Sequence, residues 1–369
     1  YSGNVNKSLT AYATGYYRTN SVTDLPYVQV MTPPNPNLRW EKVKMVNFGI
    51  DFESKNHLLS GSVEYYLKRG EDLIGRAPLD PTIGYSVGGR NEFIGNNSAL
   101  KGHGLDVQLN VHKSIGKLNW TAQLLYSKAT NKITRYDYES NTISSYFSSI
   151  ATPVPGNPRY SLYSLKWAGL DPQTGDPQVY LDGEVTKDYA SILSNLSLED
   201  LVYSGPALPT DFGSLRNNFR LGDFTVGFTI SYKFGYYFRR PSLSYSALFN
   251  NWIGHEEYGE RWMKPGDEQF TQVPSMPVAG TSSSRDFVYT YADILVEKGD
   301  HIRFQDINVS YDLRRSKHRW LPFSKVSVYG YVNQLGIIWR ANKQGLDPDY
   351  IFRLYPASPT YSFGINITL

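Results

Sequence analysis

The chain has 369 residues, of which 40% are hydrophobic and 15% aromatic, and its 37 basic residues nearly balance its 34 acidic ones. That balance excludes a dedicated nucleic-acid binder, whose binding face is strongly basic. The lack of cysteine excludes disulfides and thiolate metal sites and suits an exported protein. No run of about 18 apolar residues occurs, so the sequence contains no transmembrane helix.

The first part of the chain predicts a hairpin. A weak strand over Val5–Tyr12 precedes a loop, Arg18–Leu38, that is dense in turn formers. Lys44–Phe52 and Leu59–Leu67 then alternate between apolar and polar residues, which is the period of a strand with two different faces. The short polar segment Glu53–His57 joins them, so the two strands are expected to pair.

Three further strand pairs have the same pattern. They are Leu105–Val111 with Leu118–Tyr126, Ser214–Arg220 with Phe224–Phe234, and His301–Leu313 with Lys325–Leu335. Short turns join the members of each pair, at Lys113–Lys117, Gly222-Asp223 and Arg314–Ser324. Long segments separate the pairs and the last strand: Arg69–Gly95, Thr130–Thr210, Phe238–Gly299 and Gly336–Pro359.

The final strand, Tyr361–Leu369, shows the alternation without interruption. Its apolar members are Tyr361, Phe363, Ile365, Ile367 and Leu369, and small or polar residues separate them. Nine residues of this kind match the about 9–11 residues with which a tilted strand crosses a bilayer. We therefore expect this strand to be needed for assembly into the membrane.

The order of short and long connections indicates a barrel. Short turns on one side and long loops on the other are typical of bacterial outer-membrane β-barrels, and a sandwich has no reason to sort its connections in this way. The 30 tyrosines and seven tryptophans agree, because barrels carry aromatic girdles. The prediction is an all-β, transmembrane antiparallel β-barrel of about nine or ten strands with long extracellular loops.

Alternation also predicts which side chains face lipid. The expected lipid-facing residues are Leu59, Val63, Tyr65, Val107 and Phe228, and the expected luminal ones are Glu64, Asp106 and Gln108. A charged residue such as Glu64 would be costly against lipid and inexpensive against a wet lumen.

Several motifs resemble the C-terminal barrel part of SusC/RagA-type TonB-dependent transporters. They include Asn35–Lys42, Asn47–Asp51, Gly61–Tyr66, Gly169–Pro177, Arg261–Asp267, Val296–Arg303 and Gly345–Asp349. The resemblance covers the whole chain in family order, although Leu369 stands where family members usually end in Phe.

The resemblance implies a 22-stranded barrel with a plug domain, integral to the bacterial outer membrane and capped by a SusD-like lipoprotein. By the same resemblance, the transporter is expected to import oligosaccharides or oligopeptides with energy passed from TonB and not to be an enzyme. Residues 1–369 would supply the C-terminal part of the barrel, and the plug, the TonB-contacting segment and the N-terminal strands would lie elsewhere. Val5–Tyr12 and Tyr361–Leu369 would then be edges that pair with the missing strands.

Two other functions are compatible with the sequence, and the substrate is open between glycan and peptide. A SusC-like barrel could serve as a structural scaffold in a larger outer-membrane complex. A passive porin is disfavoured, because the family motifs belong to a plugged barrel. The oligomeric state is equally open.

Aromatic residues of the long loops are the candidate substrate-binding residues, because aromatic rings stack on sugars and on apolar side chains. The set is Tyr138, Tyr146, Phe147, Tyr160, Trp252, Tyr258, Trp262, Tyr289 and Tyr291. The alternative is that these rings pack the loops against each other or against the partner. Asp171 and Asp176 have the spacing of calcium ligands but also occupy an ordinary turn sequence, and no other cofactor is expected.

Overall fold

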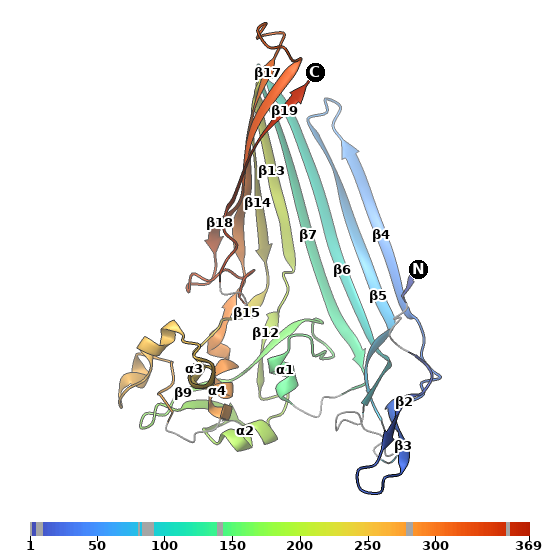
Figure 1. Cartoon of the computed structure of the whole chain (residues 1–369), viewed down its shortest axis with the longest axis vertical. Coiled ribbons are helices and arrows are strands. Elements are labelled where there is room, and N and C mark those ends of the chain that lie inside the picture. The colour runs from blue at the N-terminus through green and yellow to red at the C-terminus, as the bar shows by residue number, and fades with distance from the viewer. Residues whose placement is uncertain are drawn as a thin grey trace.

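Ten strands form one antiparallel sheet in the computed structural model, which describes residues 2–4, 10–79, 82, 92–138, 143–277, 283–351 and 355–369. Their order in the sheet follows their order in the chain (Figure 1). The strands are β1 (Ser2–Asn4), β4 (Glu41–Glu53), β5 (Leu59–Pro78), β6 (Glu92–Ile115), β7 (Leu118–Tyr136), β13 (Asp211–Leu221), β14 (Phe224–Phe234), β17 (His301–Arg314), β18 (Lys325–Arg340) and β19 (Thr360–Thr368).

Short turns and long connections lie at opposite ends of this sheet (Figure 1). The turns span residues 54–58, 116–117, 222–223 and 315–324, and we call their side the turn end and the other side the loop end. Gly116 and Gly222 begin the two-residue turns with φ of +58° and +62°. A tight hairpin turn needs this left-handed backbone, which glycine adopts without a steric cost.

Three boundaries differ from the sequence prediction. The connection predicted over Arg69–Gly95 is wrong in part, because β5 runs on to Pro78 and β6 begins at Glu92. The loop predicted over Arg18–Leu38 contains β3 (Pro26–Thr32), which pairs with β2 (Thr14–Thr19). Of the strand predicted over Val5–Tyr12, residues 5–9 lie outside the described residues, and residues 10–12 are not in a strand.

The strand register sorts side chains into one apolar and one polar face. Val63 pairs with Val107, and Leu59 pairs with Val111. One residue further along, Glu64 pairs with Asp106, and Ser62 pairs with Gln108. Directly paired residues share a face, so the predicted grouping of Leu59, Val63, Tyr65, Val107 and Phe228 against Glu64, Asp106 and Gln108 is confirmed.

Aromatic rings run across four strands of the apolar face. Trp120 stacks on Phe219 with ring centroids 6.3 Å apart, Phe219 stacks on Phe228 at 6.2 Å, and Phe228 stacks on Phe304 at 5.9 Å. The polar Asn217 also lies on this face, where its Oδ1 accepts a hydrogen bond of 3.0 Å from Trp120 Nε1. This bond satisfies a side chain that would otherwise be costly in an apolar environment.

The apolar face is exposed toward both sides of the sheet, and its side chains are partly exposed on the strands between. Ile50 on β4 is 70% exposed, and Phe363 on β19, at the other edge of the sheet, is 83% exposed. A soluble protein does not leave apolar surface of this extent uncovered, whereas lipid solvates it. The fold is that of a transmembrane antiparallel β-barrel wall.

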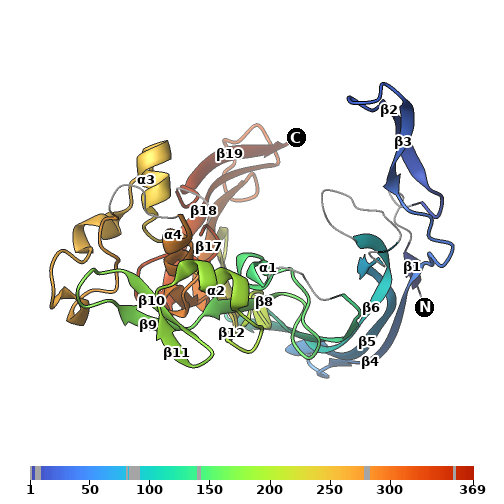
Figure 2. The same ribbon diagram turned by 90° about the horizontal axis from the view of Figure 1, so that it is seen from below.

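The sheet is curved and open. Seen along the strands, it forms an arc from β4 round to β19 (Figure 2). Within the described residues, β1 pairs with β4 through three positions and β19 pairs with β18 through nine, and these two strands are the edges of the arc.

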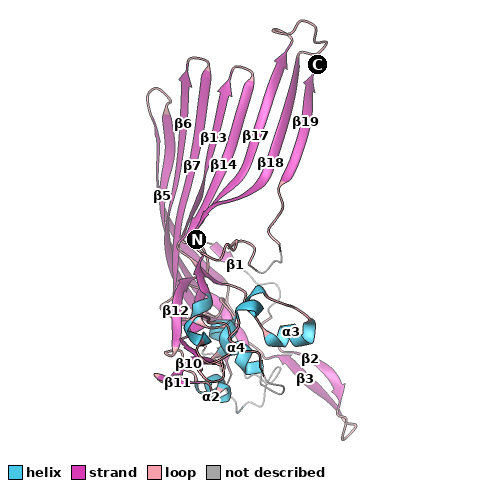
Figure 3. Cartoon of the chain, turned by 90° about the vertical axis from the view of Figure 1, so that its left-hand side faces the viewer, coloured by secondary structure: helices cyan, strands magenta, loops and turns pink. Residues whose placement is uncertain are grey.

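Small sheets and short helices fill the loop end (Figure 3). The strands are β8 (Ser161–Leu165) with β12 (Leu201–Pro206), β9 (Trp167–Leu170) with β10 (Pro177–Leu181) and β11 (Glu184–Thr186), and β15 (Tyr237–Arg239) with β16 (Val296–Lys298). The helices are α1 (Ser144–Ser148), α2 (Tyr189–Asn195), α3 (Tyr245–Asn251) and α4 (Ser283–Thr290), with 3-10 turns η2 (Glu256–Glu260), η3 (Asp267–Gln269) and η4 (Asp293–Leu295). In the described part of the chain, no helix has the length and apolar character needed to cross a membrane.

Val63→Arg should destabilise the barrel because it places a guanidinium on the lipid-facing side. The expected cost is about 2–4 kcal/mol near the bilayer midplane. The measurement is the urea midpoint of unfolding from lipid vesicles, with heat-modifiable migration in gels as a test of folding. Ser62→Arg, on the adjacent luminal position, is the matched control and should leave the midpoint nearly unchanged. Equal losses in both variants would contradict the assignment of the faces.

Deleting Tyr361–Leu369 should abolish outer-membrane localisation. The deletion removes β19 and leaves the outer edge of β18 unpaired, and an unpaired backbone group costs several kcal/mol in hydrocarbon. Fractionation of cells, followed by a heat-modifiability assay, measures the outcome. A normally folded barrel in the membrane after the deletion would show that the strand is dispensable.

Candidate substrate-binding site

The long connections build a domain with its own core at the loop end. We call residues 143–206 and the described part of 237–298 the cap. Buried apolar side chains from α1, β8, β10, α2 and α4 pack together there, among them Phe147, Leu165, Val179, Ile192 and Val288. Because these residues come from two long connections, the core fixes the position of each connection relative to the other.

Arg239 joins the two connections by hydrogen bonds. Its Nη1 donates to the carbonyl of Phe147 at 2.8 Å, and its Nη2 donates to the carbonyl of Tyr163 at 2.5 Å. The guanidinium lies 4.8 Å from the centre of the Tyr291 ring. Burial lowers the pKa of Arg239 to about 10, so the side chain remains charged at neutral pH.

Arg285 on α4 is a second connector and is only 1% exposed. Its Nε donates to Asp176 Oδ1 at 2.6 Å, and its Nη2 donates to the carbonyl of Ser275 at 2.8 Å. The side chain therefore ties three segments of the cap to one point. Such a buried cation is stable only while its hydrogen-bonding partners are in place.

Glu257 provides a third connection, in which a buried carboxylate accepts from two other segments of the cap. It forms an ion pair with Arg240, and its Oε2 accepts from the backbone of Leu243 at 2.8 Å and from Tyr289 Oη at 3.3 Å. Burial and the nearby Glu257 raise the pKa of Tyr289, so its hydroxyl remains a donor.

The nine predicted aromatic residues separate into buried and accessible sets. Tyr146, Phe147, Trp262 and Tyr289 are buried, with exposures of 9%, 2%, 7% and 1%. These rings pack within the chain, which is the alternative that the sequence left open. Ligand contact stays a prediction for the residues that the structure leaves partly or fully exposed, which are Tyr138, Tyr160, Trp252, Tyr258 and Tyr291.

The two calcium candidates face cations. Lys187 Nζ lies 2.8 Å from Asp171 Oδ2, and Arg285 pairs with Asp176. The hydrogen bond from Lys187, with backbone donors in the turn, lowers the pKa of Asp171 to about 2. Within the described residues, no group of three or more ligating side chains has the arrangement of a metal site. The geometry thus uses both carboxylates as ion-pair partners.

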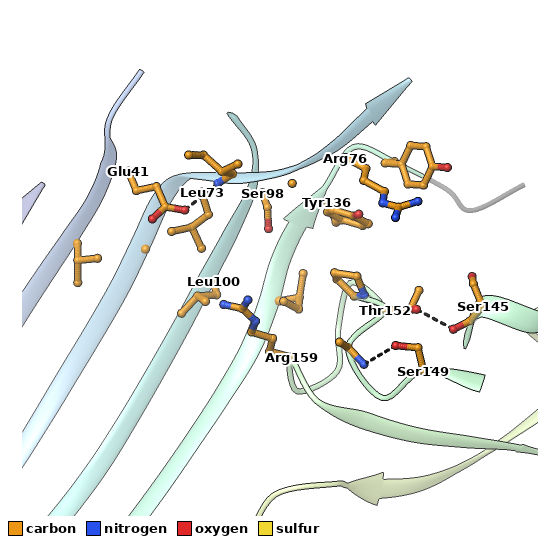
Figure 4. A pocket seen from close by; sticks show the side chains of 18 of the residues that line it. Glu41, Leu73, Arg76, Ser98, Leu100, Tyr136, Ser145, Ser149, Thr152 and Arg159 are labelled. Carbon is orange, nitrogen blue, oxygen red and sulfur yellow. Dashed lines mark hydrogen bonds between the residues drawn. The ribbon is translucent and has the colours of Figure 1, made fainter. Parts of the chain in front are cut away.

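A cavity of about 610 Å³ lies where the cap meets the loop ends of β5–β7 (Figure 4). Its floor is the register row Val43, Gly70, Leu100 and Ile133. This row lies on the polar face of the sheet, because Glu64 and Asp106 lie on the same face, nearer the turn end. The opposite wall comes from the cap segment that follows α1, which backbone hydrogen bonds of 2.9 Å join to Ile133.

Polar groups of both signs line this cavity. Arg159 extends from the cap side toward Leu100, and Arg76 and Tyr136 lie together further along the cavity (Figure 4). Tyr138, one of the predicted residues, packs edge-on against Tyr136 with centroids 6.2 Å apart. Ser145 Oγ is buried at the wall and has no hydrogen-bond partner among the described residues. The cavity can therefore offer donors and a hydroxyl to a ligand.

Sequence reasoning missed the charged members of the cavity, which are Glu41, Lys68, Arg76 and Arg159. Glu41 begins β4 and Lys68 is an ordinary polar-face residue within β5, whereas the arginines lie in segments rich in glycine and proline. A signal existed only for the arginines, because a cation in an otherwise turn-forming segment is a binding candidate. Their convergence depends on how the cap folds back onto β7.

Arg285→Ala should open the cap while leaving the barrel wall intact. The change leaves Asp176 and the Ser275 carbonyl without their donor, and removing one partner of a buried pair costs about 3–5 kcal/mol. Limited proteolysis with mass spectrometry should show new cleavage in residues 172–277. Arg319→Ala, an equal truncation at the turn end, is the control. An unchanged cleavage pattern in Arg285→Ala would contradict this role.

Two curated relatives match nearly the whole chain. TonB-dependent receptor P39 of Formosa agariphila is 21% identical over 98% of this chain, and TonB-dependent receptor P26 of the same organism is 23% identical over 91%. The matches cover 38% and 35% of the relatives, so the chain spans well under half of their length.

Solved structures agree on the fold. Structures of the RagAB peptide importer in its closed-closed state and of the RagAB peptide transporter each match 99% of this chain and 39% of their own. The TM-scores are 0.72 and 0.71 at 19% and 20% identity, which confirms the expected RagA-type barrel fold. The family model described as TonB dependent receptor-like, beta-barrel matches residues 2–252. The chain therefore belongs to the family of TonB-dependent receptor β-barrels, a family of outer-membrane receptors.

Proposed function

We propose that this chain is part of an outer-membrane transporter that imports oligosaccharides or oligopeptides with energy supplied through TonB. The observation that carries the proposal is the cavity of about 610 Å³ on the luminal face, at the mouth of the barrel wall. A concave site with a few convergent polar groups is typical of ligand binding. Family membership supports the same function, and the RagAB structures are described as those of a peptide importer.

The open arc requires further strands. Strands β1 and β19 are the edges of the ten-stranded sheet, and an edge in hydrocarbon would leave backbone groups unpaired. We infer that residues 1–369 form the C-terminal part of the barrel and that strands outside this chain close the cylinder. A barrel of the size expected for this family has a wide lumen, which a plug domain would fill. TonB would act through that missing part.

Exposed apolar side chains on the cap support a partner at the loop end. Trp252 is 91% exposed, Phe270 is 89% exposed and Met263 is 66% exposed, and all three lie within one long connection. Large apolar side chains that one extracellular connection leaves exposed support an interface with another protein. A SusD-like lipoprotein is the partner that we propose for this surface.

The charges in the cavity favour acidic substrates. Among the described residues, three cations, Lys68, Arg76 and Arg159, line it with one carboxylate, Glu41. Glu41 Oε1 already accepts a hydrogen bond of 2.9 Å from the backbone of Ile74. A carboxylate on the substrate, from an acidic peptide or from a uronic acid, would match the positive charge of Arg159.

A structural scaffold is the second candidate function, since a barrel wall of this kind could also hold an outer-membrane assembly together. The two functions differ in one measurable respect, which is energy-dependent uptake. An importer loses uptake when TonB is deleted, whereas a scaffold does not transport the substrate.

Arg159→Gln should reduce uptake of acidic oligomers by about tenfold or more. The change removes one charged hydrogen bond, which is worth about 1.5–3 kcal/mol, and about 1.4 kcal/mol corresponds to a factor of ten. The assay follows four labelled substrates in cells: a peptide with and without glutamate, and an oligosaccharide with and without glucuronate. Uptake of the neutral members should change little, and the class that is transported identifies the substrate.

Arg319→Gln is the matched control, because it removes the same charge from the exposed turn end. Unchanged uptake of every acidic oligomer in Arg159→Gln would remove the cavity from the transport route. Uptake of none of the four substrates, or uptake that persists without TonB, would favour the scaffold over the importer.

A further inference from the structure

Four cations form one row across the apolar face of the sheet. The row consists of Lys44 on β4, Arg69 on β5, Lys101 on β6 and Lys132 on β7. Each residue is paired directly with the next in the strand register, and all four are exposed. Like charges in directly opposed positions destabilise a sheet, so this row indicates an anion that offsets the repulsion.

The row marks the boundary of the lipid-facing surface on the side of the loop end. Toward the turn end, the next positions on the same face are Val46, Leu67, His103 and Thr130, and the row after that holds Phe48, Tyr65, Leu105 and Lys128. Lys128 is paired with Asp211 at 3.4 Å. On β4 and β5, where Phe48 and Tyr65 follow Val46 and Leu67, the order of aromatic and apolar residues is that of a membrane interface. The four cations thus lie at the level of the lipid head groups on the loop side.

Protein carboxylates offset only part of this charge. Glu71 lies 2.9 Å from Lys44 Nζ and 3.0 Å from Arg69 Nε, so a single anion serves two members of the row. Within the described residues, neither Lys101 nor Lys132 has a carboxylate at ion-pair distance. At the turn end of the same four strands, the apolar face carries one lysine, Lys113, so the cluster belongs to the loop side alone.

An open hollow of about 690 Å³ lies over the row. The four cations and His103 line it together with Val46 and Leu67. A molecule that fits this hollow has a negatively charged head and an apolar part that continues toward the lipid-facing side. A free inorganic anion would use only the cations and would leave the apolar lining uncovered.

We propose that this row binds the phosphate groups of a phosphorylated lipid of the outer leaflet. The lipid would place its phosphates between Lys101, Lys132 and Arg69, and its acyl chains along Val46 and Leu67. A cation near a membrane surface contributes about 1 kcal/mol to binding an anionic lipid. This site depends on the membrane-spanning fold and not on import, so lipid binding and uptake can be measured separately.

Binding of diphosphorylated lipid A to the intact protein in mild detergent tests the site. Native mass spectrometry counts the lipids retained, and titration gives the dissociation constant. Lys101→Gln combined with Lys132→Gln should weaken binding about 30-fold, the effect of two cations. Lys113→Gln combined with Lys117→Gln, the same charge change at the turn end of the same hairpin, should leave the dissociation constant unchanged.

Two further measurements complete the test. Variants that keep the charge separate a loss of charge from a loss of folding, and other ligands separate the lipid from a free anion. Lys101→Arg combined with Lys132→Arg keeps both charges and should bind as the wild type does. Dephosphorylated lipid A should bind weakly, and millimolar inorganic phosphate should not displace the intact lipid. Equal affinity in the wild type and the glutamine pair would overturn the proposal, as would complete displacement by inorganic phosphate, which would indicate a general anion site.

Discussion

The need to pair every backbone amide and carbonyl within hydrocarbon determines the rest of this structure. A strand in lipid has no water to satisfy its polar groups, so it must have a neighbour on each side. Ten strands meet this need for one another through antiparallel pairing, and within the described residues the edges are β19 on one side and, on the other, β1 and the part of β4 beyond the three positions that β1 pairs. Because the pairing is continuous, the two faces stay separate from one side of the arc to the other, as the pairing of Val63 with Val107 and of Glu64 with Asp106 illustrates.

Much of this wall could be predicted from alternation, because a strand between lipid and a wet lumen repeats every two residues. The prediction failed where this rule does not operate. Beyond the bilayer, β5 and β6 continue through positions without a clean period, so Arg69–Gly95 looked like a loop. β3 was missed because Pro26 and the prolines at positions 33, 34 and 36 give its segment the composition of a loop, although a proline is tolerated at the first residue of a strand, where Pro26 stands.

The site was less accessible to sequence reasoning than the wall. Aromatic residues in long connections could serve a ligand or a core, and composition does not separate the two. Phe147 and Tyr289 belong to the interior because the two connections fold against each other around Arg239 and Arg285, a contact between segments about 100 residues apart. Lys44, Arg69, Lys101 and Lys132 are likewise ordinary surface cations in the sequence. Only the register places them in one row.

The same length of wall carries both proposed sites, on opposite faces. Arg69, Lys101 and Lys132 form the cation row, and their chain neighbours Gly70, Leu100 and Ile133 form the floor of the cavity. Adjacent residues of a strand point to opposite sides, so the cation row outside stands at the same level of the wall as the cavity floor inside. A substitution that shifted the register of β6 by one residue would exchange the two surfaces, placing cations in the cavity and Leu100 in the lipid head groups. Strand pairing therefore specifies the position of the cavity as strictly as it specifies the lipid-facing surface.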